Sequence, residues 1–154
     1  MKRARTWTIV PMRATAAMAF LAVLGAVTPA LAENAPGASY LGRWLTESDG
    51  GVIEIYRCGP APCGRVVTSN RLRANPYARD TKNKNPRLRG RRMAGTDLLS
   101  GLEPDHDGWR GRLYNPEDGQ TYAGTMRLDG RGGLKVQGCV LYILCRSQRW
   151  KRVG

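Results

Sequence analysis

Turn-forming residues recur at close intervals along most of this chain, and they limit the elements that can form between them. From Tyr40 onward the sequence is interrupted by glycine, proline, Asn and Asp, and no segment keeps a long helical spacing of apolar residues. Short apolar runs between turn signals are typical of antiparallel β domains. The sequence predicts eight strands, at Gly42–Thr46, Gly51–Arg57, Gly64–Thr68, Thr96–Leu102, Trp109–Tyr114, Thr121–Leu128, Leu134–Val140 and Arg146–Val153.

Several of these runs alternate apolar and polar residues, as a strand with one buried face does. In the sixth run Tyr122, Met126 and Leu128 share one face, and Thr125 lies on the other. A sheet of eight short antiparallel strands joined by hairpins has two edge strands with unpaired backbone groups unless it closes on itself. We therefore expect a single all-β domain over residues 40–154, folded as a closed barrel or a strongly curved sheet.

The segment from Arg71 to Arg92, called here the basic segment, is expected to be a long loop because it contains Pro76, Pro86 and several Asn residues. It holds nine basic residues against one acidic residue, Asp80, for a net charge of +8. Such a run is either a solvated face or a patch that contacts an anionic lipid or polymer. The patch consists of Arg71, Arg73, Arg79, Lys82, Lys84, Arg87, Arg89, Arg91 and Arg92.

The first 32 residues have the pattern of a cleavable secretory signal. Basic residues precede an apolar stretch from Ala14 to Val27, and Ala30-Leu31-Ala32 supplies the small-x-small cleavage site. A membrane anchor is disfavoured because the stretch is shorter than the ~20 residues of a spanning helix. We expect cleavage near Ala32, a linker over residues 33–39 and a periplasmic or secreted protein that does not span the membrane. Nucleic acid is not an expected partner of the basic segment, because export separates the protein from the genome. Four of the 25 basic residues and none of the 12 acidic ones precede the cut, which leaves 122 residues with a net charge of +9.

All four cysteines follow the expected cleavage site, and an exported protein meets an oxidising compartment. Of the three pairings that four cysteines allow, Cys58–Cys63 and Cys139–Cys145 are favoured because each brackets a short segment that can turn back on itself. A zinc site is disfavoured, since four-thiolate sites need closer Cys-x-x-Cys spacing.

Residues for catalysis are scarce. The single histidine, His106, lies in an acidic turn, so the histidine base of a triad hydrolase has no obvious place. Glu47, Glu54, Glu117 and Asp118 offer carboxylates for glycosidase chemistry, but nothing in their spacing selects a pair. The sequence supports no catalytic residue, metal or cofactor, and a hydrolase is the less favoured function.

Aromatic residues fall on or beside most of the predicted strands. They either fill the core or line a barrel interior that holds a small apolar or amphipathic ligand. The candidate ligand-binding residues are Trp44, Trp109, Tyr114, Tyr122, Met126 and Trp150.

The first strand opens with Gly42-Arg43-Trp44, which resembles the Gly-x-Trp opening of lipocalin-type barrels. In those barrels an arginine near the end of the chain packs on that tryptophan. The resemblance implies this role for Arg149 or Arg152.

A larger set of segments resembles a widespread bacterial family of small exported proteins that is catalogued as a domain of unknown function. The resemblance covers essentially all of residues 40–153 and departs from the family in the high arginine content of the basic segment. It implies a periplasmic, lipocalin-like β-barrel with no assigned activity. The matching segments are Gly42–Thr46, Cys63–Val67, Tyr114–Tyr122, Leu134–Cys139 and Arg146–Val153, with Asp80, Asn83 and Pro86 in the Asp-x-x-Asn-x-x-Pro pattern.

The segment Asn115-Pro116-Glu117-Asp118-Gly119 has a structural and a functional interpretation. Each residue suits a hairpin turn, because Asn and Asp bond nearby backbone groups, Pro fixes φ, and Gly tolerates positive φ. Alternatively, Glu117 and Asp118 lie at the opening of the barrel and receive the polar end of a ligand or act as an acid/base pair.

Overall fold

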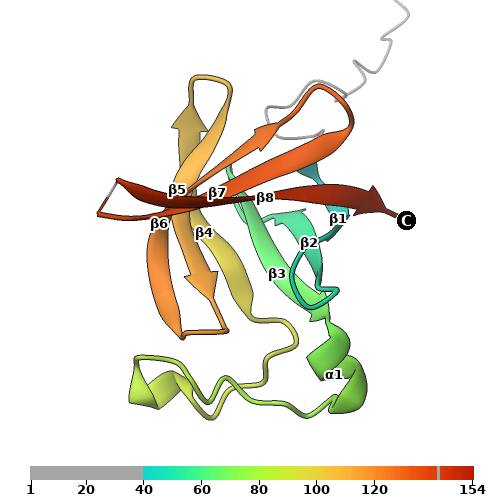
Figure 1. The fold of residues 1–154 in the computed structure, drawn as a ribbon, viewed down its shortest axis with the longest axis vertical. Coiled ribbons are helices and arrows are strands. Elements are labelled where there is room, and N and C mark those ends of the chain that lie inside the picture. Colours follow the sequence, from blue (N-terminus) through green and yellow to red (C-terminus); the bar gives the residue numbers. More distant parts are fainter. Residues whose placement is uncertain (1–39, 142) are drawn as a thin grey trace, which may run out of the picture. The chain divides into compact units, whose positions relative to one another are not determined.

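Eight antiparallel strands form a closed barrel in which each strand pairs with the next and β8 pairs with β1 (Figure 1). The structure, a computed structural model, describes residues 40–141 and 143–154. The expected signal peptide and linker lie outside these residues. The strands are β1 (Gly42–Leu45), β2 (Val52–Arg57), β3 (Pro62–Thr68), β4 (Asp97–Asp105), β5 (Gly108–Asn115), β6 (Gln120–Leu128), β7 (Gly133–Val140) and β8 (Leu144–Val153).

All eight predicted strands are present, and the sheet is closed, so the all-β barrel is confirmed. The largest difference is in β4, which continues past Leu102 to Asp105. Its last residues pair with the start of β5, where Pro104 lies opposite Trp109 and Asp105 opposite Gly108. Proline lowered the strand signal there, but the pairing with β5 extends the strand beyond its local preference.

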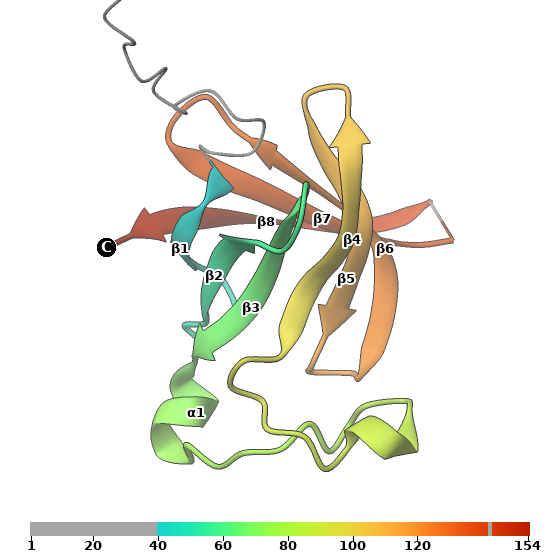
Figure 2. The ribbon, with the colours of Figure 1, turned by 180° about the vertical axis from the view of Figure 1, so that it is seen from behind.

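Since consecutive strands are antiparallel, their connections alternate between the two ends of the barrel. One end has the β1–β2, β3–β4, β5–β6 and β7–β8 connections, and the other has the remaining three. The long β3–β4 connection, residues 69–96, lies across the first end (Figures 1 and 2). We call this end the mouth.

The basic segment is not wholly a loop, which corrects the sequence prediction. It begins within α1 (Asn70–Ala74), a one-turn helix whose first turn is capped by the Ser69 hydroxyl accepting from the Leu72 amide at 3.2 Å. Leu72 is buried against the barrel. A short 3-10 helix, η2 (Pro86–Leu88), follows, and Arg79 and Arg92 form an isolated β-bridge. Of the described helices, none is long and apolar enough to span a bilayer.

The end of the barrel opposite the mouth is packed with aromatic side chains. The indole nitrogen of Trp44 donates to the carbonyl of Tyr40 at 2.8 Å, and the Tyr40 ring meets Trp109 edge-on at 6.5 Å. The guanidinium of Arg152 lies 4.3 Å from the centre of the Trp44 ring and donates to the Leu41 carbonyl at 2.7 Å. Of the two arginines considered, Arg152 therefore packs on the tryptophan, whereas Arg149 pairs with Asp129.

Both disulfides join residues that are close in sequence. Cys58 and Cys63 bracket the β2–β3 connection, and Cys139 and Cys145 face each other across the β7–β8 hairpin. The Cα atoms of the second pair are 4.0 Å apart. Each disulfide therefore constrains the tip of one hairpin rather than joining distant parts of the barrel.

Candidate functional site

A cavity of about 610 Å³ occupies the half of the barrel nearer the mouth. Its size falls in the range of pockets for small organic ligands, roughly 300–1,000 Å³. Its inner wall is mainly apolar and is formed by inward-facing residues of several strands. These include Ile53, Val66, Leu98, Leu113, Val136 and Trp150.

The rim of the cavity is charged. Asp49 comes from the β1–β2 connection, Arg71 from α1, Glu117 and Asp118 from the β5–β6 turn, and Arg146 from β8. All four connections at the mouth, or the residues next to them, thus contribute to the rim. The site therefore has an apolar surface inside the barrel and a charged surface at the mouth.

A short chain of polar contacts crosses the cavity wall between β8 and the β1–β2 connection. The Trp150 indole donates to the Gln148 side-chain oxygen at 2.9 Å, and the Gln148 amide donates to the Ser48 hydroxyl at 2.7 Å. All three residues line the cavity. These bonds satisfy the buried indole and fix the orientation of its ring against the interior.

The carboxylate of Asp118 is occupied by the hydrogen bonds of its own turn. One oxygen accepts from the Gln120 amide at 2.8 Å, and the other accepts from Asn115 at 2.9 Å and from the Tyr122 hydroxyl at 2.6 Å. Burial raises the pKa of Asp118, but these hydrogen bonds outweigh it and hold the pKa below its ordinary value. Because Asp118 is held as a bonded carboxylate, its contacts match the structural interpretation of the turn.

Glu117 differs from its neighbour. Its backbone carbonyl accepts from the Lys82 ammonium at 2.8 Å, but its carboxylate is exposed at the rim and makes no hydrogen bond or ion pair within the described residues. Within the turn, Glu117 is thus the acidic residue whose carboxylate the described residues leave unbonded.

The basic segment is attached to the barrel by Asp80, whose side chain is fully buried. Its carboxylate accepts from Asn83 at 2.7 Å, from Arg91 at 2.9 Å and from the Tyr114 hydroxyl. The Arg91 guanidinium also lies 5.2 Å from the centre of the Tyr114 ring. Burial, followed by the hydrogen bond to Asp80, raises the pKa of Tyr114 to about 12. The Asp and Asn of the Asp-x-x-Asn-x-x-Pro pattern therefore hold this segment on the mouth.

A second attachment is the close approach of the basic segment to the β5–β6 turn. The Lys84 amide donates to the Gly119 carbonyl at 3.1 Å. Gly119 has a φ of +75°, and a Cβ atom there would lie 1.8 Å from the Lys82 carbonyl oxygen. Glycine is required at this position for both its backbone conformation and the space it leaves.

The predicted ligand-binding residues divide into two groups. Tyr114, Tyr122 and Trp150 line the cavity. Trp44, Trp109 and Met126 are buried in the packed half of the barrel and are not part of the lining. Of the nine basic residues of the predicted anionic patch, Arg71 alone lines the cavity.

Two polar residues of the site, Arg146 and Gln148, were not among the predicted ones. They precede Trp150 in β8 by four and two residues, so all three side chains point to the same face of the strand. The two-residue periodicity of a β-strand could therefore have identified both residues from the position of Trp150. No group of three His, Cys, Asp or Glu side chains capable of holding a metal ion occurs in the described part of the chain.

An eight-stranded closed antiparallel barrel with a cavity open at one end is the architecture of lipocalin-like proteins. A solved structure of this kind matches with a TM-score of 0.64 at 21% identity, over 74% of this chain and 82% of the other. It is described as "Protein HP1028 from the human pathogen Helicobacter pylori belongs to the lipocalin family". At this identity the likeness shows the fold alone.

The family is shown by sequence. Residues 42–152 match the family model described as "Uncharacterized protein conserved in bacteria (DUF2147)", and the chain belongs to this family. The resemblance to a bacterial family of unknown function is therefore confirmed. No curated protein matches the chain.

Proposed function

We propose that this protein binds one small, largely apolar or amphipathic molecule inside the barrel. The observation that carries the proposal is the cavity, whose inner wall is apolar and whose rim is charged. Burial of apolar ligand surface against this wall contributes roughly 25 cal/mol per Å², which is the main source of affinity for such ligands. The structural neighbour is described as a lipocalin, which supports the proposal by fold, although fold alone does not determine function.

The wall and rim specify how a ligand lies. Its apolar part packs against Val66, Val136 and Trp150, and its polar end stays near Arg71 and Arg146, where both guanidinium groups remain in contact with water. This orientation leaves no ligand charge buried without a partner.

Binding rather than catalysis is the function that the lining residues support best. They include no histidine, and their cysteine, Cys145, is held in a disulfide. The carboxylate of Asp118 is bonded within its turn. Ligand binding needs none of these groups to react.

We also propose that the protein acts after export, in the periplasm or outside the cell. The pattern of the first 32 residues and the two disulfides support this location. Intact mass measurement of protein from its host should give a chain that begins at Glu33. A chain that retains Met1 and its basic residues would contradict export by cleavage.

Native mass spectrometry of protein purified from its host tests the ligand proposal directly. We expect an added mass that dissociates on activation and is identified as an apolar or amphipathic molecule. A matched pair of variants then locates it: Val66→Trp fills part of the cavity, whereas Val67→Trp changes the neighbouring residue, which is not part of the lining. The first should weaken binding several-fold and the second should not. Equal affinities, or no bound molecule in any preparation, would contradict the proposal.

A second candidate function is docking of the basic segment on an anionic lipid or polymer of the cell envelope. Among the described residues, only Arg91 of its nine cations forms an ion pair with a carboxylate. The remaining positive charge attracts phosphate groups, and this attraction weakens with salt. Binding to anionic vesicles that stays constant from low to high salt, or after replacement of the arginines by glutamine, would contradict this function.

A further inference from the structure

The tip of the β7–β8 hairpin exposes large apolar side chains. Val140 is 43% exposed, Leu141 78%, Ile143 77% and Leu144 69%. We call these four residues the apolar tip. Elsewhere in the described chain, large apolar side chains with exposure above a third occur singly, at Leu45, Tyr77 and Leu88. Four exposed apolar side chains at the tip of one hairpin mark a surface that meets an apolar partner.

The apolar tip lies at the end of the β7–β8 hairpin, which extends past the neighbouring strands of the barrel. Cys139 and Cys145 are paired across the two strands and joined by the disulfide, so the two strands cannot separate at this point. The hairpin projects beyond the other strands in two opposite views (Figures 1 and 2). The disulfide thus holds the two strands together at the base of the apolar tip.

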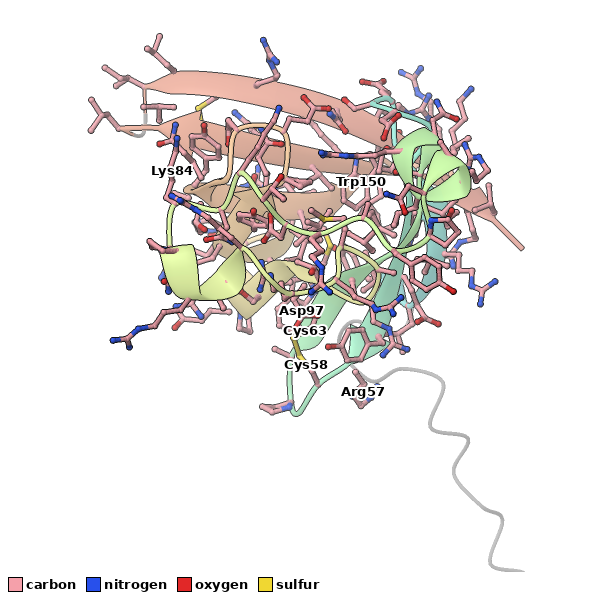
Figure 3. The ribbon with its side chains drawn as sticks, turned by 90° about the horizontal axis from the view of Figure 1, so that it is seen from below. Arg57, Cys58, Cys63, Lys84, Asp97 and Trp150 are labelled. Carbon is pink, nitrogen blue, oxygen red and sulfur yellow. A yellow bond between two sulfur atoms is a disulfide. The ribbon has the colours of Figure 1, made fainter. Side chains whose placement is uncertain are left out.

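The apolar tip belongs to the same end of the barrel as the basic segment and the cavity. Val140 and Leu144 line the cavity together with Arg146, which lies two residues after Leu144 in β8. Figure 3, viewed from the mouth, shows Lys84 on the same side of the molecule as the end of this hairpin. Exposed apolar residues flanked by cations on one face match the two layers of an anionic bilayer, with its acyl chains beneath its phosphate groups.

We infer that the apolar tip inserts into the surface of an anionic phospholipid bilayer while cations of the mouth, including Lys84, Arg87 and Arg146, contact the lipid headgroups. Apolar burial and electrostatic attraction then act on the same face. Since the tip also forms part of the cavity wall, docking brings the opening of the cavity to the membrane surface. The inference stands apart from the ligand-binding proposal, because insertion requires no occupant in the cavity.

A second copy of the chain fits this face less well. Pairing of two apolar tips would bring two basic segments together, each with a net charge of +8. Like charges across an interface oppose association, whereas an anionic bilayer neutralises them. Charge therefore selects the lipid surface over a dimer.

The test is flotation of the oxidised full-length mature protein with vesicles of phosphatidylglycerol and phosphatidylethanolamine, beside vesicles of phosphatidylcholine alone. We expect binding to the first and little to the second. The variant L141N/I143N should bind the anionic vesicles about tenfold more weakly, because two large side chains no longer enter the apolar layer. Leu141 has a φ of +51°, a conformation that Asn tolerates well, so this variant retains its fold.

Salt separates the inference from docking through charge alone. At high salt the electrostatic part of binding fades, so the remaining binding of the wild type should depend most strongly on Leu141 and Ile143. The variant K84Q/R87Q should lose binding mainly at low salt. If K84Q/R87Q weakened vesicle binding and L141N/I143N did not, the result would support docking of the basic segment and would contradict insertion of the apolar tip.

Two matched control variants make the same types of substitution at sites away from the apolar tip and the basic segment. Leu45→Asn changes a partly exposed leucine of β1, and R57Q/R131Q removes two cations from the opposite end of the barrel. Both should bind vesicles as the wild type does. Vesicle binding that is absent, or equal in L141N/I143N and the wild type, overturns the inference. A dimer in sedimentation that L141N/I143N dissociates would show that a second copy covers the apolar tip, and it overturns the inference as well.

Discussion

The Tyr114 hydroxyl on β5 donates a hydrogen bond to the carboxylate of Asp80, which lies 34 residues earlier in the chain. Asp80 belongs to the basic segment and is fully buried, and it also binds Asn83 and Arg91. A single carboxylate thus joins the barrel wall to the segment that crosses the mouth. Since Tyr114 also lines the cavity, the attachment of the basic segment and the shape of the site depend on the same side chain.

Tyr114→Phe should lower the free energy of unfolding by about 1–3 kcal/mol at neutral pH, because the buried carboxylate loses one donor. Denaturant unfolding measures this change. Tyr77→Phe is the matched control, since the Tyr77 ring is 69% exposed and its hydroxyl makes no hydrogen bond within the described residues. Equal losses in the two variants would show that the Asp80 contact contributes nothing.

Alkaline pH should weaken the same contact. The pKa of Tyr114 is raised from 10 to about 12, so the folded state holds a proton that the unfolded chain releases earlier. The contribution of Tyr114 to stability is therefore complete below pH 10 and is lost as the pH rises to about 12. The free energy of unfolding, measured at several pH values across this interval, should therefore fall less steeply with rising pH for Tyr114→Phe than for the wild type. Identical slopes would contradict the raised pKa.

Gly119→Ala should destabilise the protein by more than Gly130→Ala. Both glycines have positive φ, at +75° and +70°, so each substitution carries a similar backbone cost of about 1 kcal/mol. At Gly119 the added Cβ also meets the Lys82 carbonyl, whereas at Gly130 no atom lies within 4 Å. We expect a difference of about 2 kcal/mol or more between the variants in thermal or denaturant unfolding. Gly119→Val should be worse still. Equal losses would mean that the basic segment does not rest on this turn.

The sequence predicted the strands well because the signals for them are local. Alternation along a strand and a turn at its end are both visible within about ten residues, so all eight strands were found. The contact of Arg152 with Trp44 joins the last and first strands of the barrel and was expected only through the resemblance to lipocalin-type barrels. The role of Asp80 was missed, since its partner Tyr114 is distant in sequence.

The cavity was only partly predictable for a similar reason. Alternation shows that Trp109, Met126 and Tyr122 face inward, but the position along the barrel axis decides whether an inward residue packs or lines the cavity. Trp109 and Met126 face each other across β5 and β6 near the closed end, whereas Tyr122 lies near the mouth. That position depends on the register of the closed sheet, which a single strand pattern does not contain.

Reduction of the two disulfides should loosen two hairpin tips before it unfolds the barrel. Each disulfide closes a loop of only about five residues, which contributes roughly 2 kcal/mol by the chain-entropy estimate. Hydrogen exchange of the reduced protein should show faster exchange beside Cys58 and beside Cys145, with slow exchange retained in β5 and β6. Global unfolding on reduction would contradict this expectation. Non-reducing peptide mapping checks the pairing itself, and Cys58 joined to Cys139 or Cys145 would show that the pairing is wrong.

Glu117→Gln separates the two interpretations of the β5–β6 turn. The Glu117 carboxylate makes no hydrogen bond or ion pair in the described chain, so its neutralisation should change the free energy of unfolding by less than about 0.5 kcal/mol.

Asp118→Asn is the contrasting variant, because Asp118 accepts three hydrogen bonds and its pKa is lowered by them. Its contribution to stability is present above the ordinary pKa of 3.8 and is lost as the pH falls below it. Asp118→Asn should therefore lower the melting temperature at neutral pH and reduce the decrease in melting temperature as the pH falls into the acid range.

If the turn is purely structural, Glu117→Gln leaves both the melting temperature and the affinity for a cavity ligand unchanged. Loss of ligand binding in Glu117→Gln at an unchanged melting temperature would instead show that the rim carboxylate contacts the polar end of the ligand.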